Sequence, residues 1–276
     1  MKFWRILKAD LYRAATQVNF AVAVLLFGML CFTAEGYAEH GASKAVLELA
    51  LFHQPEEISG KFQLSNYSLF LSGIGAYNLM FSPIIAAIPS IPNFCRERRC
   101  GYARLVIPRC GITQRCLSLH LSALISGGLT VLTGYGLYGL FCWFLFPDPT
   151  EEMTQWLPAP AWSGVLSQLA GAFFFGMVAV LLPILLSGVS KNTYFVLCAS
   201  FALFYTYCNF LDTLSNRLFY NGQLERSFRV MQFYPTSVFQ CFLGHEIWRL
   251  AMWSVIAVLV FGFLRLCMGR RFDKGA

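Results

Sequence analysis

The densest charge in this chain lies in a short basic segment, residues 93–116. It holds six arginines and a single acid, Glu97. The six arginines are Arg96, Arg98, Arg99, Arg104, Arg109 and Arg115. Residues 94–106 have the pattern of an amphipathic helix that ends before Pro108, and a rigid helix of this kind is what docking to a soluble partner requires. The alternative interpretation is a solvated positive face without a partner.

Other residue pairs that could do chemistry lack the groups that would complete them. Gly60-Lys61 is followed by Phe62 rather than Ser or Thr, so it forms no phosphate-binding loop. His245-Glu246 lacks the second histidine of a helical zinc site. Glu56-Glu57 is interpreted as a solvated acid cluster, because no Arg or His follows it at helical spacing. We therefore expect no catalytic residue and no enzyme activity on this chain.

Four of the ten cysteines, Cys95, Cys100, Cys110 and Cys116, fall within the basic segment. Their spacing lacks the close CxxC pairs of a zinc ribbon. We expect reduced thiols there, with neither a disulfide nor a metal ion.

The basic segment, residues 93–116, lies between long charge-free stretches, and the elements that these stretches form must hold it in place. Hydrophobic residues make up 57% of the chain and charged residues 13%, and a soluble fold with so little charge could not cover its surface. A transmembrane helix needs about 20 residues. The gaps between charges predict an all-α membrane protein with six transmembrane helices, which together form one transmembrane domain over residues 1–276. The expected helices are 18–33, 67–91, 117–146, 162–187, 193–211 and 247–266.

Three connecting segments have amphipathic or mixed character. Residues 1–17 alternate basic and apolar side chains at helical spacing, which predicts an amphipathic helix on the inner membrane surface. The outer segment after the first crossing is expected to hold a small helix over residues 42–52. Residues 212–246 are aromatic but interrupted by Arg217, Arg226, Arg229 and Pro235, so short outer or re-entrant helices are predicted there.

The placement of charge indicates topology. The chain has 21 Lys and Arg against 14 Asp and Glu, and the basic residues gather at the two ends and in alternate connections. Positive residues are retained on the cytoplasmic side of a membrane. We therefore expect both termini in the cytoplasm and membrane lipid as a partner, and no binding to nucleic acid.

The predicted spans carry few polar groups. None of the first five has a central charge, so an ion-coupled transport mechanism is disfavoured. Five polar residues are candidates for lining a pathway, or else hydrogen-bond between helices: Asn78, Ser82, Gln168, Thr206 and Asn209. A stripe of small residues recurs at every fourth position of the third span and predicts a close helix contact, either between subunits or inside one bundle. Its members are Ser118, Ser122, Ser126, Thr130 and Gly134.

These features together resemble the membrane (permease) subunits of type-2 ATP-binding-cassette exporters, such as those of bacterial peptide or antibiotic export and immunity. The resemblance covers nearly the whole chain as topology: an amphipathic first helix, a tight turn between the fourth and fifth spans, and an apolar outer hairpin before the sixth. Glu97 and Gly101 match a Glu-x3-Gly segment after the second span, and Arg109 and Arg115 match positions before the third. Leu119-His120 departs from the family, which often has a lysine there.

The resemblance implies a function and partners. Two permease subunits, identical or homologous, would face each other in a bacterial cell membrane and bind two separate ATPase subunits that hold ATP and Mg. The coupling contacts would come from Glu97, Arg98, Gly101, Arg109 and Arg115. The expected substrate is amphipathic or lipophilic: a peptide antibiotic, a drug or a lipid. The alternatives are a stand-alone carrier, an intramembrane enzyme, and a non-transporting sensor or immunity protein that binds a peptide.

Overall fold

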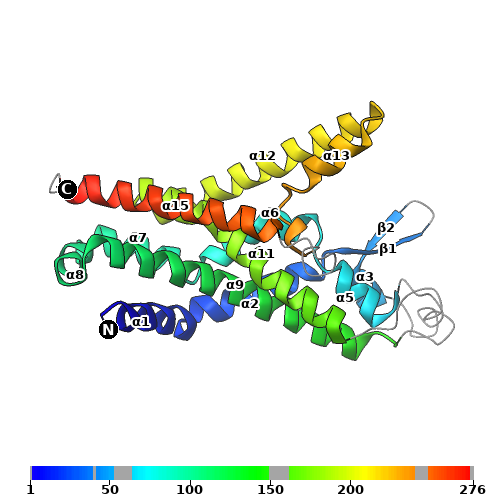
Figure 1. Cartoon of the computed structure of the whole chain (residues 1–276). Helices are drawn as coiled ribbons and strands as arrows, with labels where there is room; N and C mark the ends of the chain where they lie inside the picture. Colours follow the sequence, from blue (N-terminus) through cyan, green and yellow to red (C-terminus); the bar gives the residue numbers. More distant parts are fainter. Residues whose placement is uncertain (1, 40–41, 53–63, 149–161, 240–247, 274–276) are drawn as a thin grey trace.

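The computed structural model is a bundle of helices that run roughly alongside one another (Figure 1). It describes residues 2–39, 42–52, 64–148, 162–239 and 248–273. Glu56-Glu57, Gly60-Lys61 and His245-Glu246 lie outside these ranges. The amino-terminal half contains α1 (Lys2–Thr16), α2 (Val18–Cys31), β1 (Glu35–Glu39), β2 (Ala42–Ala45), α3 (Val46–Phe52), α5 (Asn66–Ser72), α6 (Ala76–Ala87), α7 (Ile91–Arg99) and α8 (Tyr102–Cys110). The rest contains α9 (Ile112–Leu145), α11 (Trp162–Val189), α12 (Thr193–Tyr220), α13 (Leu224–Met231) and α15 (Trp248–Asp273).

Four helices, α9, α11, α12 and α15, are long and apolar enough to cross a membrane. Two bent pairs bring the number to six if each pair is one span: α1 with α2, bent by 59°, and α5 with α6, bent by 69°. The prediction of an all-helical, multi-pass membrane protein is confirmed, with four to six candidate spans. The structure also contains a small antiparallel hairpin, β1 with β2, which the sequence analysis does not predict.

The core lies around α9, which packs most extensively against α11 and also contacts α1 and α2. Glycines permit this close approach. A Cβ atom added at Gly176 of α11 would lie 2.5 Å from the carbonyl oxygen of Gly127 in α9, and one at Gly134 would lie 2.8 Å from the carbonyl oxygen of Val24 in α2. Inside lipid, packing of this kind replaces the hydrophobic drive that holds soluble helices together.

The predicted second span, 67–91, is not continuous. It breaks between α5 and α6, and α6 ends at Ala87. The hydroxyls of Tyr135 and Tyr138 donate to the carbonyls of Phe70 and Leu69, at 2.5 and 2.7 Å, and the amide of Asn78 donates to the carbonyl of Gly73 at 2.5 Å. These side chains satisfy backbone groups near the break, and satisfied backbone is the condition for non-helical chain at membrane depth.

Two segments at the opposite end from α8 also differ from the prediction. Residues 42–45 pair with β1 as a strand, so the expected helix of residues 42–52 begins only at Val46. The helix α12 continues nine residues past Leu211, and of the short helices expected in residues 212–246 the structure describes α13. Ser215 of α12 lies 2.8 Å from Ser227 of α13, which joins the two helices as a hairpin.

Candidate coupling site at the basic end

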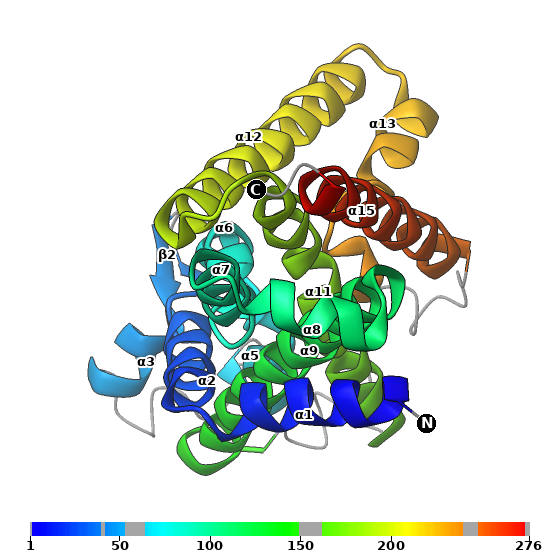
Figure 2. The same cartoon turned by 90° about the vertical axis from the view of Figure 1, so that its left-hand side faces the viewer.

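One end of the bundle, called here the basic end, gathers α7, α8, the amino-terminal helix α1 and the end of α15 (Figure 2). The segment predicted as a single helix over 94–106 is instead two helices, α7 and α8, and this part of the prediction is wrong. Gly101 joins them with φ at +70°, in the left-handed region that favours glycine. Pro108 lies inside α8 rather than after its end. The two helices form a corner that belongs to none of the candidate spans.

An ion cluster holds three helices together beneath this corner. The carboxylate of Glu97 on α7 accepts from Arg13 on α1 and Arg115 on α9, both at 2.5 Å. Arg115 also reaches Asp10 on α1 at 2.8 Å, and Ser118 donates to Asp10 at 2.6 Å. Two acids therefore balance two arginines. The side chains of Arg115 and Glu97 are only 5% and 13% exposed, so solvent screens this pair weakly, whereas Arg13 is 47% exposed.

A second set of contacts joins α7 to the turn between α11 and α12. Arg98 is buried and donates to the carbonyls of Ser187 and Ser190, the latter at 3.2 Å. Arg99 donates to the carbonyl of Lys191 at 2.9 Å. Carbonyls at a helix end lack partners within the helix, and a cation is favourable there. Arg98 therefore faces the bundle and caps α11, so it does not lie on a docking surface.

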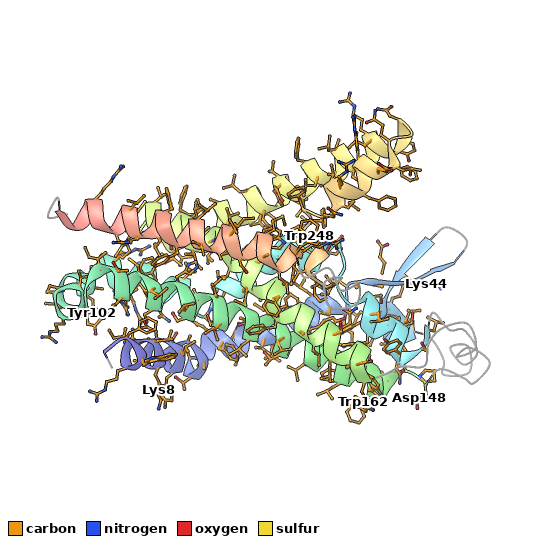
Figure 3. All side chains as sticks on the ribbon, in the orientation of Figure 1. Lys8, Lys44, Tyr102, Asp148, Trp162 and Trp248 are labelled. Carbon is orange, nitrogen blue, oxygen red and sulfur yellow. The ribbon has the colours of Figure 1, made fainter. Side chains whose placement is uncertain are left out.

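The outer surface of the corner is formed mainly by α8. Tyr102, Leu105, Pro108 and Arg109 are exposed there, and Leu105 is an unusually apolar side chain for such a position. Figure 3 shows Tyr102 at the extreme of the basic end. Gly101 and Arg109 thus belong to the corner itself, whereas Glu97 and Arg115 connect it to the bundle.

The amino-terminal helix α1 lies across the basic end at an angle to the spans (Figure 2). Leu7 and Ala14 are buried, while Trp4 and Tyr12 are each 71% exposed. Lys8 projects from the outer side of this helix (Figure 3). Exposed aromatic and basic side chains on one helix suit the boundary between lipid and water.

The five residues predicted as pathway-lining are not brought together. Asn78 and Ser82 are buried on α6, and Gln168 is buried on α11. Thr206 and Asn209 lie on the exposed side of α12. Ser82 and Thr206 donate to carbonyls of their own helices, which is how hydroxyls are usually satisfied in helices.

The stripe of small residues on α9 is buried within the chain. Ser118 contacts α1 through Asp10, and Gly134 lies against α2. The hydroxyls of Ser122, Ser126 and Thr130 donate to carbonyls of α9 itself. The side chains between these ends are also buried, so the stripe forms an internal seam of this bundle.

Asp10 and Arg13 are the members of the cluster that the sequence analysis does not single out. The helix predicted over residues 1–17 rests on its basic and apolar side chains, and this pattern gives its one acid no role. An acid in an otherwise basic helix, three residues before Arg13, was the available signal. What the sequence could not show is that the helix folds back against α9, which brings Asp10 to Arg115.

The cysteines of the corner offer a direct test of its geometry. Cys95 is buried while Cys100 is exposed, and burial raises the pKa of the Cys95 thiol. Because the thiolate is the reactive form, a maleimide should label a variant that retains only Cys100 at least about tenfold faster than one that retains only Cys95. Mass spectrometry of the labelled protein measures both rates. Equal rates in the folded protein would contradict the inward packing of α7.

No family model matches the chain, and no curated protein matches it. Its class therefore rests on the fold: this is a helical multi-pass membrane protein with four to six candidate spans. Its distinguishing feature is a helical corner outside those spans, joined to α1 and α9 by ion pairs and to the end of α11 by a buried arginine.

Proposed function

We propose that this chain is the permease subunit of an ATP-driven exporter in a bacterial cell membrane. It moves an amphipathic or lipophilic substrate outward, using a separate ATPase subunit that docks on the α7–α8 corner. The basic end, with both termini, faces the cytoplasm, where the positive-inside rule places it. A second permease subunit, identical or homologous, completes the transporter.

The ion cluster under the corner is the observation that carries this proposal. A partner that pushes on α8 moves α7, and Glu97 passes this movement to α1 and α9 through Arg13 and Arg115. At the same time, Arg99 passes it to the turn that begins α12. A small displacement at the corner therefore reaches three parts of the bundle, as a coupling element between two states requires.

The corner also has the surface chemistry of a docking site. It presents Tyr102 and Leu105 with Arg109 on one short helix outside the candidate spans. Tyr and Arg are enriched at protein interfaces, and an exposed apolar side chain among charged ones is typical of an anchor. This mixture suits a pocket with acidic edges on a soluble ATPase.

A variant of Leu105 tests the docking surface. Leu105→Asp should abolish co-purification with the proposed ATPase subunit, because it places a charge where an apolar anchor must be desolvated. The matched control is Leu51→Asp, which alters a leucine of similar exposure on α3, outside the candidate spans. ATP-dependent efflux from vesicles gives the functional measurement.

Two results would contradict the proposal. Recovery of the wild-type protein without any ATPase is the first. The second is uptake or efflux by this chain alone under an ion gradient, which would indicate a stand-alone carrier. If the wild type binds the ATPase and Leu105→Asp binds it equally well, the docking surface lies elsewhere.

A further inference from the structure

The side of α1 that faces away from the bundle carries aromatic and basic residues at helical spacing. Trp4, Lys8 and Tyr12 follow at every fourth position, and all three are exposed. Arg5 is exposed beside them, and Lys8 projects away from the bundle (Figure 3). These four residues are called here the outward stripe. Within the described part of the chain, neither Arg5 nor Lys8 forms an ion pair, so both charges are available to a ligand.

The neighbouring helix α2 places the outward stripe at the surface of the bilayer. One side of α2 is apolar and exposed, and its members are Val18, Val22, Leu25 and Met29. In a chain that spans a membrane, such a side faces lipid. The helix α1 is bent by 59° from α2, and the bend lies at Gln17, next to the first of these residues. A helix that leaves the lipid-facing side at this point, with basic and aromatic side chains, lies at the level of the headgroups.

Contacts within the protein hold α1 in this position. The amide of Asn93 on α7 donates to the side-chain oxygen of Gln17 at 2.6 Å, across the bend. Leu7 and Ala14 are buried on the side of α1 opposite the outward stripe, and α1 packs against α9. The helix is therefore ordered before any ligand binds, which lowers the entropic cost of binding.

The ion cluster beneath α1 takes no part in binding at the outward stripe. Arg13 and Arg115 are already balanced by Glu97 and Asp10, and the side chains of both acids are only 13% exposed. The crevice beside the cluster has a volume of about 30 Å³, which is room for one or two water molecules and too small for a phosphate group. The acids of the cluster thus face inward, and the exposed charge of the outward stripe is positive.

We propose that the outward stripe binds the headgroup of an anionic phospholipid in the leaflet at the basic end. Arg5 and Lys8 are three residues apart, about 5–6 Å between their Cβ atoms, and hold one phosphate between them. Trp4 and Tyr12 flank it at the depth of the glycerol backbone, where amphipathic rings are favoured. A zwitterionic lipid binds less well, because its own ammonium group already compensates the phosphate.

The acidic surface of a soluble protein fits the outward stripe less well than a lipid does. Lys8 points sideways from the bundle and not beyond its end (Figure 3). The exposed apolar side of α2 continues directly from α1, and a soluble partner at the stripe would have to lie against it. Lipid covers both helices without a break.

Quenching of Trp4 fluorescence by brominated lipids tests this proposal. The protein is the full chain with the other five of its six tryptophans changed to phenylalanine, reconstituted into phosphatidylcholine vesicles. The same mole fraction of phosphatidylglycerol or phosphatidylcholine with brominated acyl chains is then included. The phosphatidylglycerol should occupy the site beside Trp4 at least about fivefold more often, because each cation near an anionic surface contributes about that factor. A salt concentration near 1 M should reduce this preference, since it screens exposed charges.

Removal of the two cations gives the matched comparison. In the Trp4-only protein, Arg5→Gln combined with Lys8→Gln should abolish the preference, while both lipids still quench Trp4. Lys191→Gln removes an exposed lysine from the turn between α11 and α12 and should leave the preference unchanged.

Three results would overturn the proposal. The first is equal quenching by the two lipids before any cation is removed, and the second is a preference that survives the double replacement. The third is a Trp4 that neither lipid quenches, because the outward stripe would then face water or a soluble protein. The ATPase plays no part in this test, so it is independent of the proposed export function.

Discussion

Replacement of Glu97 by alanine is expected to destabilise the protein by about 1–3 kcal/mol and to abolish ATP-dependent transport. The carboxylate joins α7 to both α1 and α9, through Arg13 and Arg115. Its loss leaves the buried Arg115 with Asp10 alone, and a buried group that loses one partner costs roughly this amount. The midpoint of thermal unfolding in detergent measures the first effect, and efflux from vesicles with the ATPase measures the second.

The double replacement of Asp10 and Glu97 sharpens this prediction. Each single variant leaves Arg115 with one acid, whereas the double variant leaves a buried guanidinium with none. The double variant should therefore lose more stability than the sum of the two single losses, because an uncompensated buried charge costs about 3–5 kcal/mol.

A surface pair provides the control for these variants. Glu225 and Arg229 lie 3.8 Å apart on α13, and Glu225 is 93% exposed. Exposed pairs of this kind contribute between about 0 and 1 kcal/mol, so Glu225→Ala should change little. If the stability lost in the double variant only equals the sum of the two single losses, Arg115 is hydrated and its two ion pairs act independently. Normal transport by Glu97→Ala would remove its proposed role in coupling.

The spans could be predicted because charge is expensive in lipid, so the gaps between charges mark them directly. The same rule explains where the prediction stopped too early. It ended the fifth span before Asp212, whereas the helix α12 continues to Tyr220, and Asp212 accepts a hydrogen bond from Tyr234 at 2.9 Å. Charge marks where apolar chain ends and not where a helix ends, so the last turns of α12 could not be predicted from the gaps.

The break between α5 and α6 could not be predicted from local sequence. It depends on Tyr135 and Tyr138, which lie more than sixty residues away and satisfy its carbonyls. The candidate site likewise has a part that local sequence predicts and a part that depends on distant contacts. Glu97 and Arg115 could be singled out from the basic segment, but their bonds to Asp10 and Arg13 depend on how α1 folds back. Local pattern identified the charged residues, and tertiary contact decided which of them face inward.

Alanine at Gly176 is expected to destabilise the bundle strongly, because its methyl group would meet the backbone of the neighbouring helix. The added Cβ atom would lie 2.5 Å from the carbonyl oxygen of Gly127 and 2.9 Å from the Cα atom of Gly128. Both are backbone atoms of α9, so neither can rotate away, and the two helices must separate. Overpacking of this kind costs about 1–3 kcal/mol, and we expect the upper end because α9 and α11 form the most extensive contact of the bundle.

Gly262 of α15 is the matched control, because a Cβ atom added there would meet nothing within 4 Å. Both glycines lie inside helices, where alanine alone is favoured by up to about 1 kcal/mol. Gly262→Ala should therefore be neutral or slightly stabilising, and Gly176→Ala should lower the thermal unfolding midpoint in detergent. The two variants share the same change in helix propensity, so the difference between them isolates the contact. If both behave alike, α9 and α11 do not approach as closely as the structure shows, and the glycines of that contact are not what sets the spacing of the bundle.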